Sequence, residues 1–182
     1  MKADINEKFA IPEGIQVSLA DGTFTVKGPK GQVSRKLSLP GINSKVEGSE
    51  IAFSSKNATQ REKKIIMTFK AHLKSMFKGV TEGHVYKLKV CSSHFPMTAA
   101  VKGSQLEIKN YFGEQIPRTF EIPQGVTVKV DGQVIMVDGV EKELVGQTAA
   151  KIELGTKRAR FDKRIFQDGI YLTEKDGKPV GR

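Results

Sequence analysis

Several short segments of the chain alternate apolar and polar side chains, which is the pattern of β-strands that bury one face. In residues 85–90 (VYKLKV), a tyrosine, a leucine and a valine fall on one face, and two lysines fall on the other. In residues 126–130 valine recurs at every second position, and the Asp131-Gly132 pair that follows suits a tight hairpin turn. The alternation therefore predicts antiparallel strands that are joined by hairpins.

The period of the apolar positions changes to three or four residues between about Ala58 and Lys78, which predicts an amphipathic helix. Thr59 and Glu62 have the spacing of a capping box at its start, and Gly79 stands where a helix stop is expected. The apolar stripe that would face a sheet consists of Ile65, Ile66, Phe69, Leu73, Met76 and Phe77.

A second helix is predicted over about Val140–Leu154, and part of its surface is nearly bare. Its small residues are Gly146, Ala149 and Ala150, beside a stripe of Leu144, Thr148 and Ile152. Glycine inside a helix costs about 1 kcal/mol relative to alanine, so a close contact should compensate for it. Either close packing against the sheet or close approach of an RNA backbone, with Gln147 and Lys151 beside it, would do so.

The chain can be read twice. Residues 23–55 align with residues 105–139 when small insertions are allowed, and each copy is followed by a helical pattern. The matched residues include Val26-Lys27 with Ile108-Lys109, Gly31 with Gly113, Arg35 with Arg118, and Leu39-Pro40 with Ile122-Pro123. We therefore expect an α+β fold of two duplicated modules, residues 1–81 and 82–182, each a small, mainly antiparallel β-sheet packed against one α-helix.

The positive charge is concentrated in two segments. The 182 residues carry a formal net charge of +10. Lys56 to Lys89 holds nine cations and two acids, and Lys151 to Arg182 holds nine cations and five acids. Such basic surfaces favour polyanionic partners, and nucleic acid in the first place. No apolar run approaches the roughly 18 residues that a membrane span requires, and the single cysteine fits a reducing compartment.

The aromatic content bears on the kind of nucleic acid. The chain has no tryptophan and three tyrosines. Proteins that stack single-stranded bases usually expose aromatic side chains at the site. Structured RNA, recognised through phosphates, 2′-hydroxyls and shape, therefore suits this composition better, and duplex DNA is not excluded.

The sequence contains no convincing catalytic or metal-binding set. His84, Cys91 and His94 lack a fourth ligand at a familiar spacing, so we expect no metal and no cofactor. Asp131 and Asp138 precede glycines at turns, which is sufficient to explain them. No nucleophile, base and orienting group stand together in the sequence, so we expect that the protein is not an enzyme.

The segment Gly28–Gly31 (GPKG) has the form of a phosphate-binding loop. A P-loop would need two more spacer residues and a following Lys-Ser or Lys-Thr. The GxxG clamp of KH domains is closer in form but belongs between helices, whereas this segment lies between strand patterns. We therefore expect a hairpin turn, with Lys30 at its tip and able to reach a phosphate.

Three segments carry a resemblance to a known family. The sequences DGVEKELVGQTAAKIE (138–153) and RIFQDGIYLTEK (164–175) resemble the second half of the large-subunit ribosomal protein six family, whose eukaryotic member is called protein nine. VKGPKGQVSR (26–35) resembles its first half. The ending resembles the archaeal and eukaryotic branch. Phe161 departs from it, because that branch usually has a basic residue there, which this chain has at Arg160.

The resemblance implies a two-domain protein without enzymatic activity that is ribosome-bound in the cytoplasm. It would bind large-subunit rRNA near the translation-factor-binding region, the sarcin–ricin loop and the stalk base, beside other large-subunit proteins. The family's main rRNA contacts come from the second domain. Carried onto this chain, the rRNA-binding residues would be Gly146, Gln147, Lys151, Lys157, Arg158, Arg160, Lys163, Arg164, Lys175, Lys178 and Arg182. Secondary contacts in the first domain would come from Lys30, Lys63, Lys70, Lys74 and Lys78.

Two alternative functions are tied to specific observations. A free KH-like RNA-binding regulatory protein would prefer short single strands and would place Gly28–Gly31 in a helical setting. An RNA-processing enzyme would depend on a carboxylate such as Asp138. No membrane and no small-molecule substrate is expected as a partner.

Overall fold

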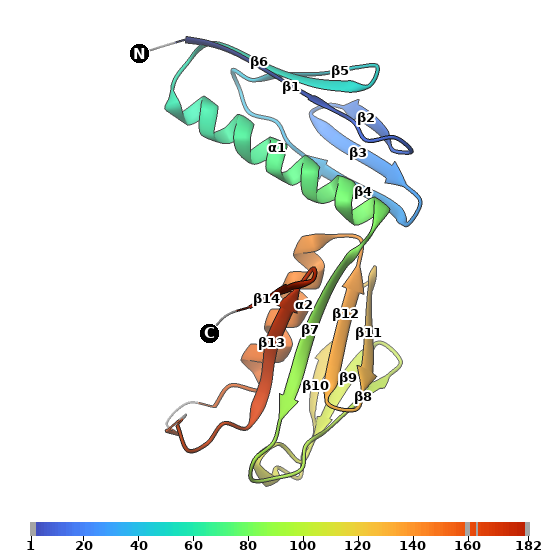
Figure 1. Ribbon diagram of the computed structural model, residues 1–182, viewed down its shortest axis with the longest axis vertical. Coiled ribbons are helices and arrows are strands. Elements are labelled where there is room, and N and C mark those ends of the chain that lie inside the picture. Colours follow the sequence, from blue (N-terminus) through green and yellow to red (C-terminus); the bar gives the residue numbers. More distant parts are fainter. Residues whose placement is uncertain (1–2, 159–160, 163, 181–182) are drawn as a thin grey trace. The chain divides into compact units, whose positions relative to one another are not determined.

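The chain in the computed structural model forms two compact units, residues 1–83 and 84–182. The structure describes residues 3–158, 161–162 and 164–180. Each unit combines one long α-helix with antiparallel sheets (Figure 1), so the predicted α+β class is confirmed. The boundary between Gly83 and His84 falls two residues after the expected position.

Unit 1 contains two three-stranded sheets and the helix α1 (Gln60–Thr81). The first sheet has the order β1 (Ala3–Ala10), β6 (Glu50–Ala58), β5 (Asn43–Glu47). The second has the order β2 (Gln16–Ala20), β3 (Thr23–Gly28), β4 (Gly31–Lys36). The sequence predicted one small sheet per module. Unit 1 instead has two sheets, because β2, β3 and β4 pair only with one another.

The helix α1 begins where the capping box predicts. The Thr59 N–H donates a hydrogen bond to Glu62 Oε2 at 2.7 Å, and the Arg61 N–H donates to Thr59 Oγ1 at 3.3 Å. Ile66 and Leu73 are buried on the predicted stripe, as are Met76 and Phe77. The hydrogen bonds satisfy N–H groups that the first helical turn leaves without a partner in the helix, and the stripe fixes which face is buried.

The predicted helix stop at Gly79 is wrong. The helix continues through a buried Gly79 to Thr81, and the chain turns at Gly83, whose φ is +79°. The last turn packs against β3, since a Cβ at Gly28 would stand 2.7 Å from Val80 Cγ2. Packing between the helix end and the hairpin therefore outweighs the low helix propensity of glycine.

Unit 2 repeats this arrangement and extends it. Its five-stranded sheet has the order β11 (Val126–Asp131), β12 (Val134–Gly139), β7 (His84–Cys91), β13 (Gly169–Lys175), β14 (Lys178–Pro179). Its three-stranded sheet has the order β10 (Arg118–Glu121), β9 (Gln105–Lys109), β8 (Thr98–Lys102). The helix α2 spans Lys142–Gly155, and a single 3₁₀ turn, η1, spans Tyr111–Gly113 between β9 and β10.

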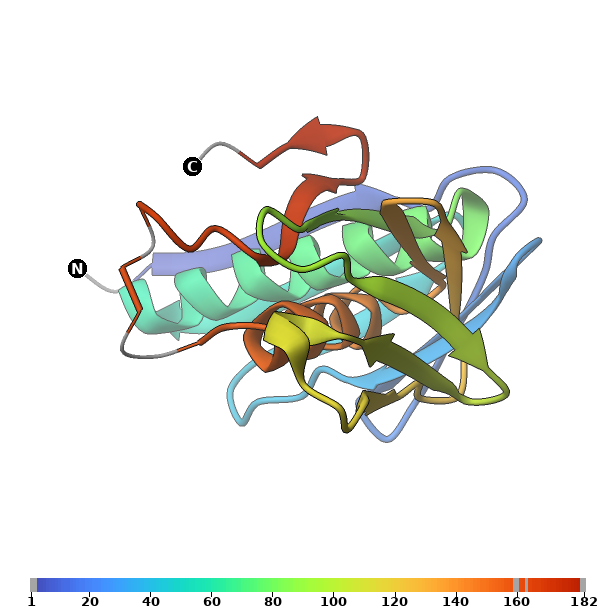
Figure 2. The same ribbon diagram turned by 90° about the horizontal axis from the view of Figure 1, so that it is seen from below.

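The duplication is visible in the strand order. The set β1-β6-β5 of unit 1 corresponds to β7-β12-β11 of unit 2, and β2-β3-β4 corresponds to β8-β9-β10. In unit 2, β13 then pairs antiparallel with the other edge of β7. Figure 2 shows α2 in orange and the β13–β14 hairpin in red. Unit 2 therefore differs from unit 1 by one added connection and one added hairpin.

The core of unit 2 lies between α2 and the sheet. Tyr86, Leu88 and Val90 of β7 are buried, as the alternation in 85–90 predicts. Helix α2 buries Val145, Thr148, Ala149 and Ile152. The buried Thr148 hydroxyl donates a hydrogen bond to the Leu144 carbonyl at 2.7 Å, so its polar atom is satisfied within the helix.

Candidate nucleic-acid interface

The outer face of α2 presents most of the residues that the sequence singled out, but Ala149 is buried, so its prediction as part of the bare surface is wrong. Gln147, Ala150 and Lys151 are exposed, and Gly146 is half-buried. A Cβ built on Gly146 would stand 3.7 Å from Tyr86 Cε2, which is an ordinary van der Waals distance. Packing inside unit 2 therefore does not require glycine at position 146.

Gly155, at the end of the same helix, is different. A Cβ there would lie 2.1 Å from Phe120 Cε1, so the fold itself requires a glycine. Of the two explanations for a bare helix surface, close packing accounts for Gly155. It does not account for Gly146.

Side chains from the β9–β10 connection and from the start of β10 hold the C-terminal end of α2. The Arg118 guanidinium donates a hydrogen bond to the Gly155 carbonyl and pairs with Glu114 through bonds of 2.6 and 2.8 Å. The Glu114 carboxylate raises the pKa of Arg118, and the Arg118 guanidinium lowers the pKa of Glu114. The Tyr111 hydroxyl donates to the Thr156 carbonyl. These bonds satisfy carbonyls that the helix leaves without a partner at its end.

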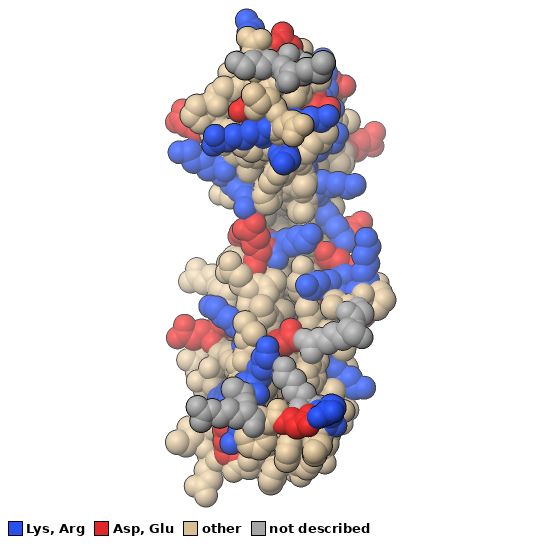
Figure 3. Space-filling view, turned by 90° about the vertical axis from the view of Figure 1, so that its left-hand side faces the viewer, with Lys and Arg blue, Asp and Glu red and all other residues tan. Residues whose placement is uncertain are grey.

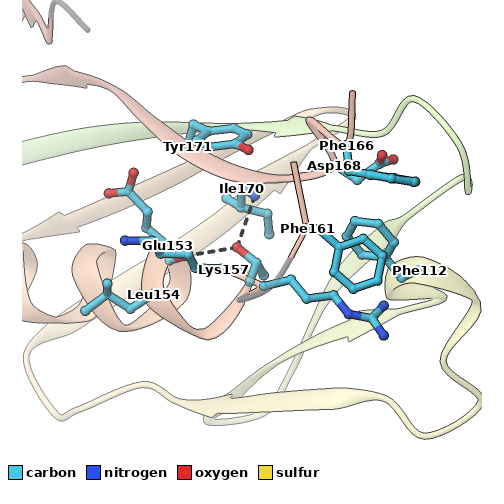
Figure 4. A pocket seen from close by; sticks show the side chains of 11 residues that line it. Phe112, Glu153, Leu154, Lys157, Phe161, Phe166, Asp168, Ile170 and Tyr171 are labelled. Carbon is cyan, nitrogen blue, oxygen red and sulfur yellow. Dashed lines mark hydrogen bonds between the residues drawn. The ribbon is translucent and has the colours of Figure 1, made fainter. Parts of the chain in front are cut away.

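Thr156 then connects the helix end to β13. Its Oγ1 accepts a hydrogen bond from the Ile170 N–H at 3.0 Å and lies 3.2 Å from the Glu153 carbonyl oxygen (Figure 4). Thr156 and Ile170 are both buried. The start and the end of the connection between α2 and β13 are therefore anchored at one point.

The candidate cations of this connection have different surroundings. Lys157 and Arg158 are exposed directly after α2. Arg164 is exposed and forms an ion pair with Asp162, with Nη2 2.9 Å from Oδ2. The candidates Arg160, Lys163 and Arg182 lie outside the residues that the structure describes.

The β13–β14 hairpin carries two further candidate cations, of which Lys175 lies near the Tyr86 ring. Lys175 and Lys178 are exposed, and Lys175 Nζ lies 5.9 Å from the centroid of the Tyr86 ring. This is the ring whose edge faces Gly146. Along α2, Gly146 and Gly155 are separated by about 14 Å at 1.5 Å per residue, and Lys157 follows two residues after the helix. The candidate contacts therefore occupy one extended region of unit 2.

Three phenylalanines near the start of the connection form a cluster that the sequence analysis missed. The ring centroids of Phe112 and Phe161 are 5.8 Å apart, and those of Phe161 and Phe166 are 5.1 Å apart. The Arg158 guanidinium carbon lies 4.4 Å from the Phe161 centroid and 5.0 Å from that of Phe112. These rings and the end of α2 surround a pocket of about 310 Å³ (Figure 4).

No sequence pattern joins Phe112 to the other two rings, because about 50 residues separate them. Two of the three rings, Phe161 and Phe166, lie five residues apart in the basic segment Lys151 to Arg182, and this pair is the signal that the sequence offered. In the sequence, Phe161 is otherwise only a departure from the family pattern, and nothing else near it indicates that its ring packs with others.

Asp168, just before β13, holds the start of this strand to the residues that follow β7. Its buried carboxylate accepts hydrogen bonds from the Ser93 N–H at 2.6 Å and the His94 N–H at 3.0 Å, and its Oδ2 lies 2.6 Å from His94 Nδ1. Burial alone would raise the pKa of Asp168, but these hydrogen bonds outweigh it, so the pKa is lowered. The carboxylate is thus held as an anion that ties β13 to the end of β7.

The candidate secondary contacts of unit 1 serve partly as internal supports. The Lys30 ammonium donates a hydrogen bond to the Glu82 carbonyl, just after α1. Lys70 Nζ lies 3.6 Å from Glu7 Oε2 and 5.6 Å from the Phe9 ring centroid. Lys63 and Lys74 are exposed, and Lys78 is half-buried. On the face drawn in Figure 3, Lys and Arg side chains predominate over acidic ones in both units.

The segment Gly28–Gly31 forms the predicted hairpin. Gly28 pairs with Gly31 across a two-residue turn between β3 and β4. It therefore has no helical setting, which weighs against a KH-like protein.

The histidines have structural partners. His84 Nδ1 lies 2.8 Å from Asp176 Oδ2, and His94 contacts Asp168. Among the described residues, no three His, Cys, Asp or Glu side chains are grouped so that they could hold a metal ion. Within the same part of the chain, no helix is long and apolar enough to cross a membrane.

Comparisons with known proteins agree with this architecture. A family model described as ribosomal protein L6 matches residues 11–83 and 95–169, one segment in each unit. The large ribosomal subunit protein uL6 of Methanosarcina mazei is 45% identical over 175 residues, which cover 96% of this chain and 99% of that protein. The uL6 protein of Methanococcus vannielii is 42% identical over 174 residues, 96% of each chain. The chain therefore belongs to the ribosomal protein L6 family and is a structural protein of the large ribosomal subunit, not an enzyme.

Proposed function

We propose that this chain, ribosome-bound in the cytoplasm, stabilises folded large-subunit rRNA near the translation-factor-binding region and the stalk base. Its second unit makes the main contact, and its neighbours are the sarcin–ricin region of the rRNA and other large-subunit proteins. The observation that carries the proposal is the glycine at position 146. The fold of unit 2 leaves room for a side chain at this position.

Glycine at position 146 lowers the stability of α2, and no contact inside unit 2 requires it. It destabilises the helix by about 1 kcal/mol relative to alanine, and a Cβ would meet Tyr86 only at an ordinary contact distance. A bare helix surface allows an RNA backbone to approach closely, with Gln147 and Lys151 exposed beside it. The benefit of glycine is therefore expected in the complex and not in the isolated protein.

Cations lie at both ends of this bare surface. Lys175 lies against Tyr86 near Gly146, and Lys157 and Arg158 follow the C-terminal end of the helix. Cations in these positions suit successive phosphates of a rigid polyanion, which hold the register of the complex. The remaining proposed contacts are Arg164 and Lys178, with Arg160, Lys163 and Arg182 outside the described residues.

Unit 1 is proposed as a peripheral contact. Lys30 contacts the Glu82 carbonyl and Lys70 pairs with Glu7. Of the candidates on α1, Lys63 and Lys74 are therefore the exposed ones. Lys87 of the same basic sequence segment lies 3.0 Å from Glu174 within unit 2. The strong positive balance of Lys56–Lys89 is therefore reduced by ion pairs in the fold.

The experiment is the substitution Gly146→Ala, tested on the free protein and on its complex. We expect the melting temperature to stay unchanged or rise, because alanine favours the helix. Affinity for deproteinised large-subunit rRNA should fall about fivefold or more, since an overpacked contact costs about 1–3 kcal/mol. Filter binding and thermal denaturation measure the two quantities.

Gly155→Ala is the matched control on the same helix. Its Cβ would collide with Phe120, so this variant should lose stability as a free protein. Unchanged rRNA affinity of a folded Gly146→Ala variant would contradict the proposed contact at α2.

A further inference from the structure

The phenylalanine cluster beside α2 has ring surface that is open to solvent. Phe161 is 38% exposed, and Phe112 and Phe166 are half-buried. The rings come from the β9–β10 connection and from the α2–β13 connection, and together with Leu154 and Tyr171 they line the pocket (Figure 4). An open aromatic cluster next to a basic segment is unusual for a surface that serves only as packing.

The backbone at Phe112 is strained in the position that places its ring there. Its φ and ψ are +50° and +32°, in the left-handed region that bulky residues rarely adopt. Such a conformation costs about 1–3 kcal/mol, and it persists where the surroundings impose it. The Tyr111 ring, 4.9 Å away and edge-on, and the buried Tyr111 hydroxyl bond to Thr156 hold this turn against the helix end. The position of the Phe112 ring in the pocket wall is therefore set by contacts within unit 2.

The side chain over the rings is a guanidinium. Arg158 lies 4.4 Å from the Phe161 centroid and 5.0 Å from the Phe112 centroid, a geometry typical of cation–π contacts. Aromatic rings and arginine planes are the two surfaces on which proteins stack unpaired RNA bases. The volume of about 310 Å³ lies at the lower end of the range for ligand sites, so the pocket suits one small flat group.

Charge distinguishes a nucleotide from an apolar protein side chain as the ligand. Lys157 and Arg158 are exposed at the pocket, and both line it. Asp168, which also contributes to the lining, has its carboxylate engaged by Ser93 and His94. Glu153 also lines the pocket but is half-buried. The two exposed charged side chains of the lining are thus both cations, as a phosphate next to a bound base requires.

We propose that this pocket binds one unstacked base of the large-subunit rRNA, against the Phe161 ring and the Arg158 guanidinium, with Lys157 at an adjacent phosphate. The inference rests on the proposed rRNA-binding function and adds a single-base subsite to it. It makes binding depend partly on stacking, in addition to the phosphate contacts along α2.

The test uses Phe161→Leu, which keeps an apolar side chain and removes the ring face. Affinity for deproteinised large-subunit rRNA should fall about 5- to 100-fold, because stacking of one base contributes about 1–3 kcal/mol. The slope of log affinity against log salt should stay unchanged, since no phosphate contact is lost. Lys157→Gln should instead reduce that slope by about 0.7–0.9.

Two control variants separate stacking from loop structure. Phe161→Tyr keeps the ring face and should bind within about twofold of the parent chain. Ile165, 63% exposed in the same connection, does not line the pocket, so Ile165→Ala should also bind normally. Equal weakening by Ile165→Ala and Phe161→Leu would contradict a specific base site.

Chemical probing of the rRNA gives a second measurement. The parent chain should protect one unpaired base that becomes reactive again with Phe161→Leu. If the parent chain binds large-subunit rRNA no better than small-subunit rRNA, the proposed function fails. If it binds selectively, but Phe161→Leu leaves affinity and protection unchanged, the base pocket alone is wrong.

Discussion

In both units a cation from the corresponding hairpin reaches the C-terminal end of the long helix. In unit 1 the Lys30 ammonium, from the β3–β4 turn, donates a hydrogen bond to the Glu82 carbonyl. In unit 2 the Arg118 guanidinium, from the start of β10, donates to the Gly155 carbonyl. The end of a helix carries partial negative charge and unsatisfied carbonyls, so the same place in the fold attracts a cation in both units.

The two contacts differ in strength. Lys30 is exposed, whereas Arg118 is half-buried, pairs with Glu114 in two bonds and lies 4.1 Å from the Tyr111 ring centroid. Beyond the helix end, unit 1 ends within two residues of α1, whereas unit 2 continues into the basic connection and β13. In this chain the proposed binding surface thus lies in the unit whose helix end is held by more contacts.

The largest expected difference between the units concerns charge reversal. We expect Lys157→Glu with Arg158→Glu to weaken rRNA binding by roughly two orders of magnitude or more and to lower the salt slope by at least the 0.7–0.9 expected for the Lys157 phosphate contact. The matched pair Lys63→Glu with Lys74→Glu, also exposed but on α1, should weaken it less than about fivefold. A salt-dependent binding titration measures both. Equal losses would remove the distinction between a main and a peripheral unit.

A smaller effect concerns the helix ends. Arg118→Met should lower the free energy of unfolding by about 2–3 kcal/mol, because the Gly155 carbonyl and Glu114 both lose a charged partner. Lys30→Met removes one exposed bond and should cost about 1 kcal/mol or less. Urea denaturation gives both values. A larger loss for Lys30→Met would mean that unit 1 has the stronger helix anchor.

The smallest expected effect is the pH dependence of the stability that the Asp168 carboxylate contributes. Its pKa in the folded chain lies below the ordinary value of 3.8, so it contributes stability above that value, which is lost as pH falls through the lowered pKa. Asp168→Asn should therefore be less stable near neutral pH, by about 1–2 kcal/mol. The difference from the parent chain should shrink below about pH 4.

Amide hydrogen exchange across this pH range identifies the region that responds. Exchange at Ser93 and His94, whose N–H groups donate to Asp168, should become faster in Asp168→Asn at neutral pH. Exchange in α1 should stay the same and serves as the internal control. A difference between the variants that persists at low pH would show that the carboxylate charge is not the cause.

Much of the fold follows from local patterns. Alternation at 85–90 predicted a strand that buries Tyr86, Leu88 and Val90, and Thr59 with Glu62 predicted the start of α1. The hairpin at Gly28–Gly31 was predicted from the strand patterns around it. These features depend on residues close in sequence, whose period or turn chemistry can be read directly. Gly79 was misjudged because its place in the helix is decided by packing near the helix end.

For the candidate site, local sequence patterns predicted the positive charge, the exposed residues Gln147, Ala150 and Lys151 of α2 and the family, but not that Ala149 is buried. Tertiary structure alone decided which glycine is required by packing, since only the positions of Phe120 and Tyr86 distinguish Gly155 from Gly146. It also brought Phe112 to Phe161 and gave Lys30 and Arg118 their roles at the helix ends. These contacts join residues distant along the chain, and their geometry is set by the packing of whole elements, which no local pattern encodes.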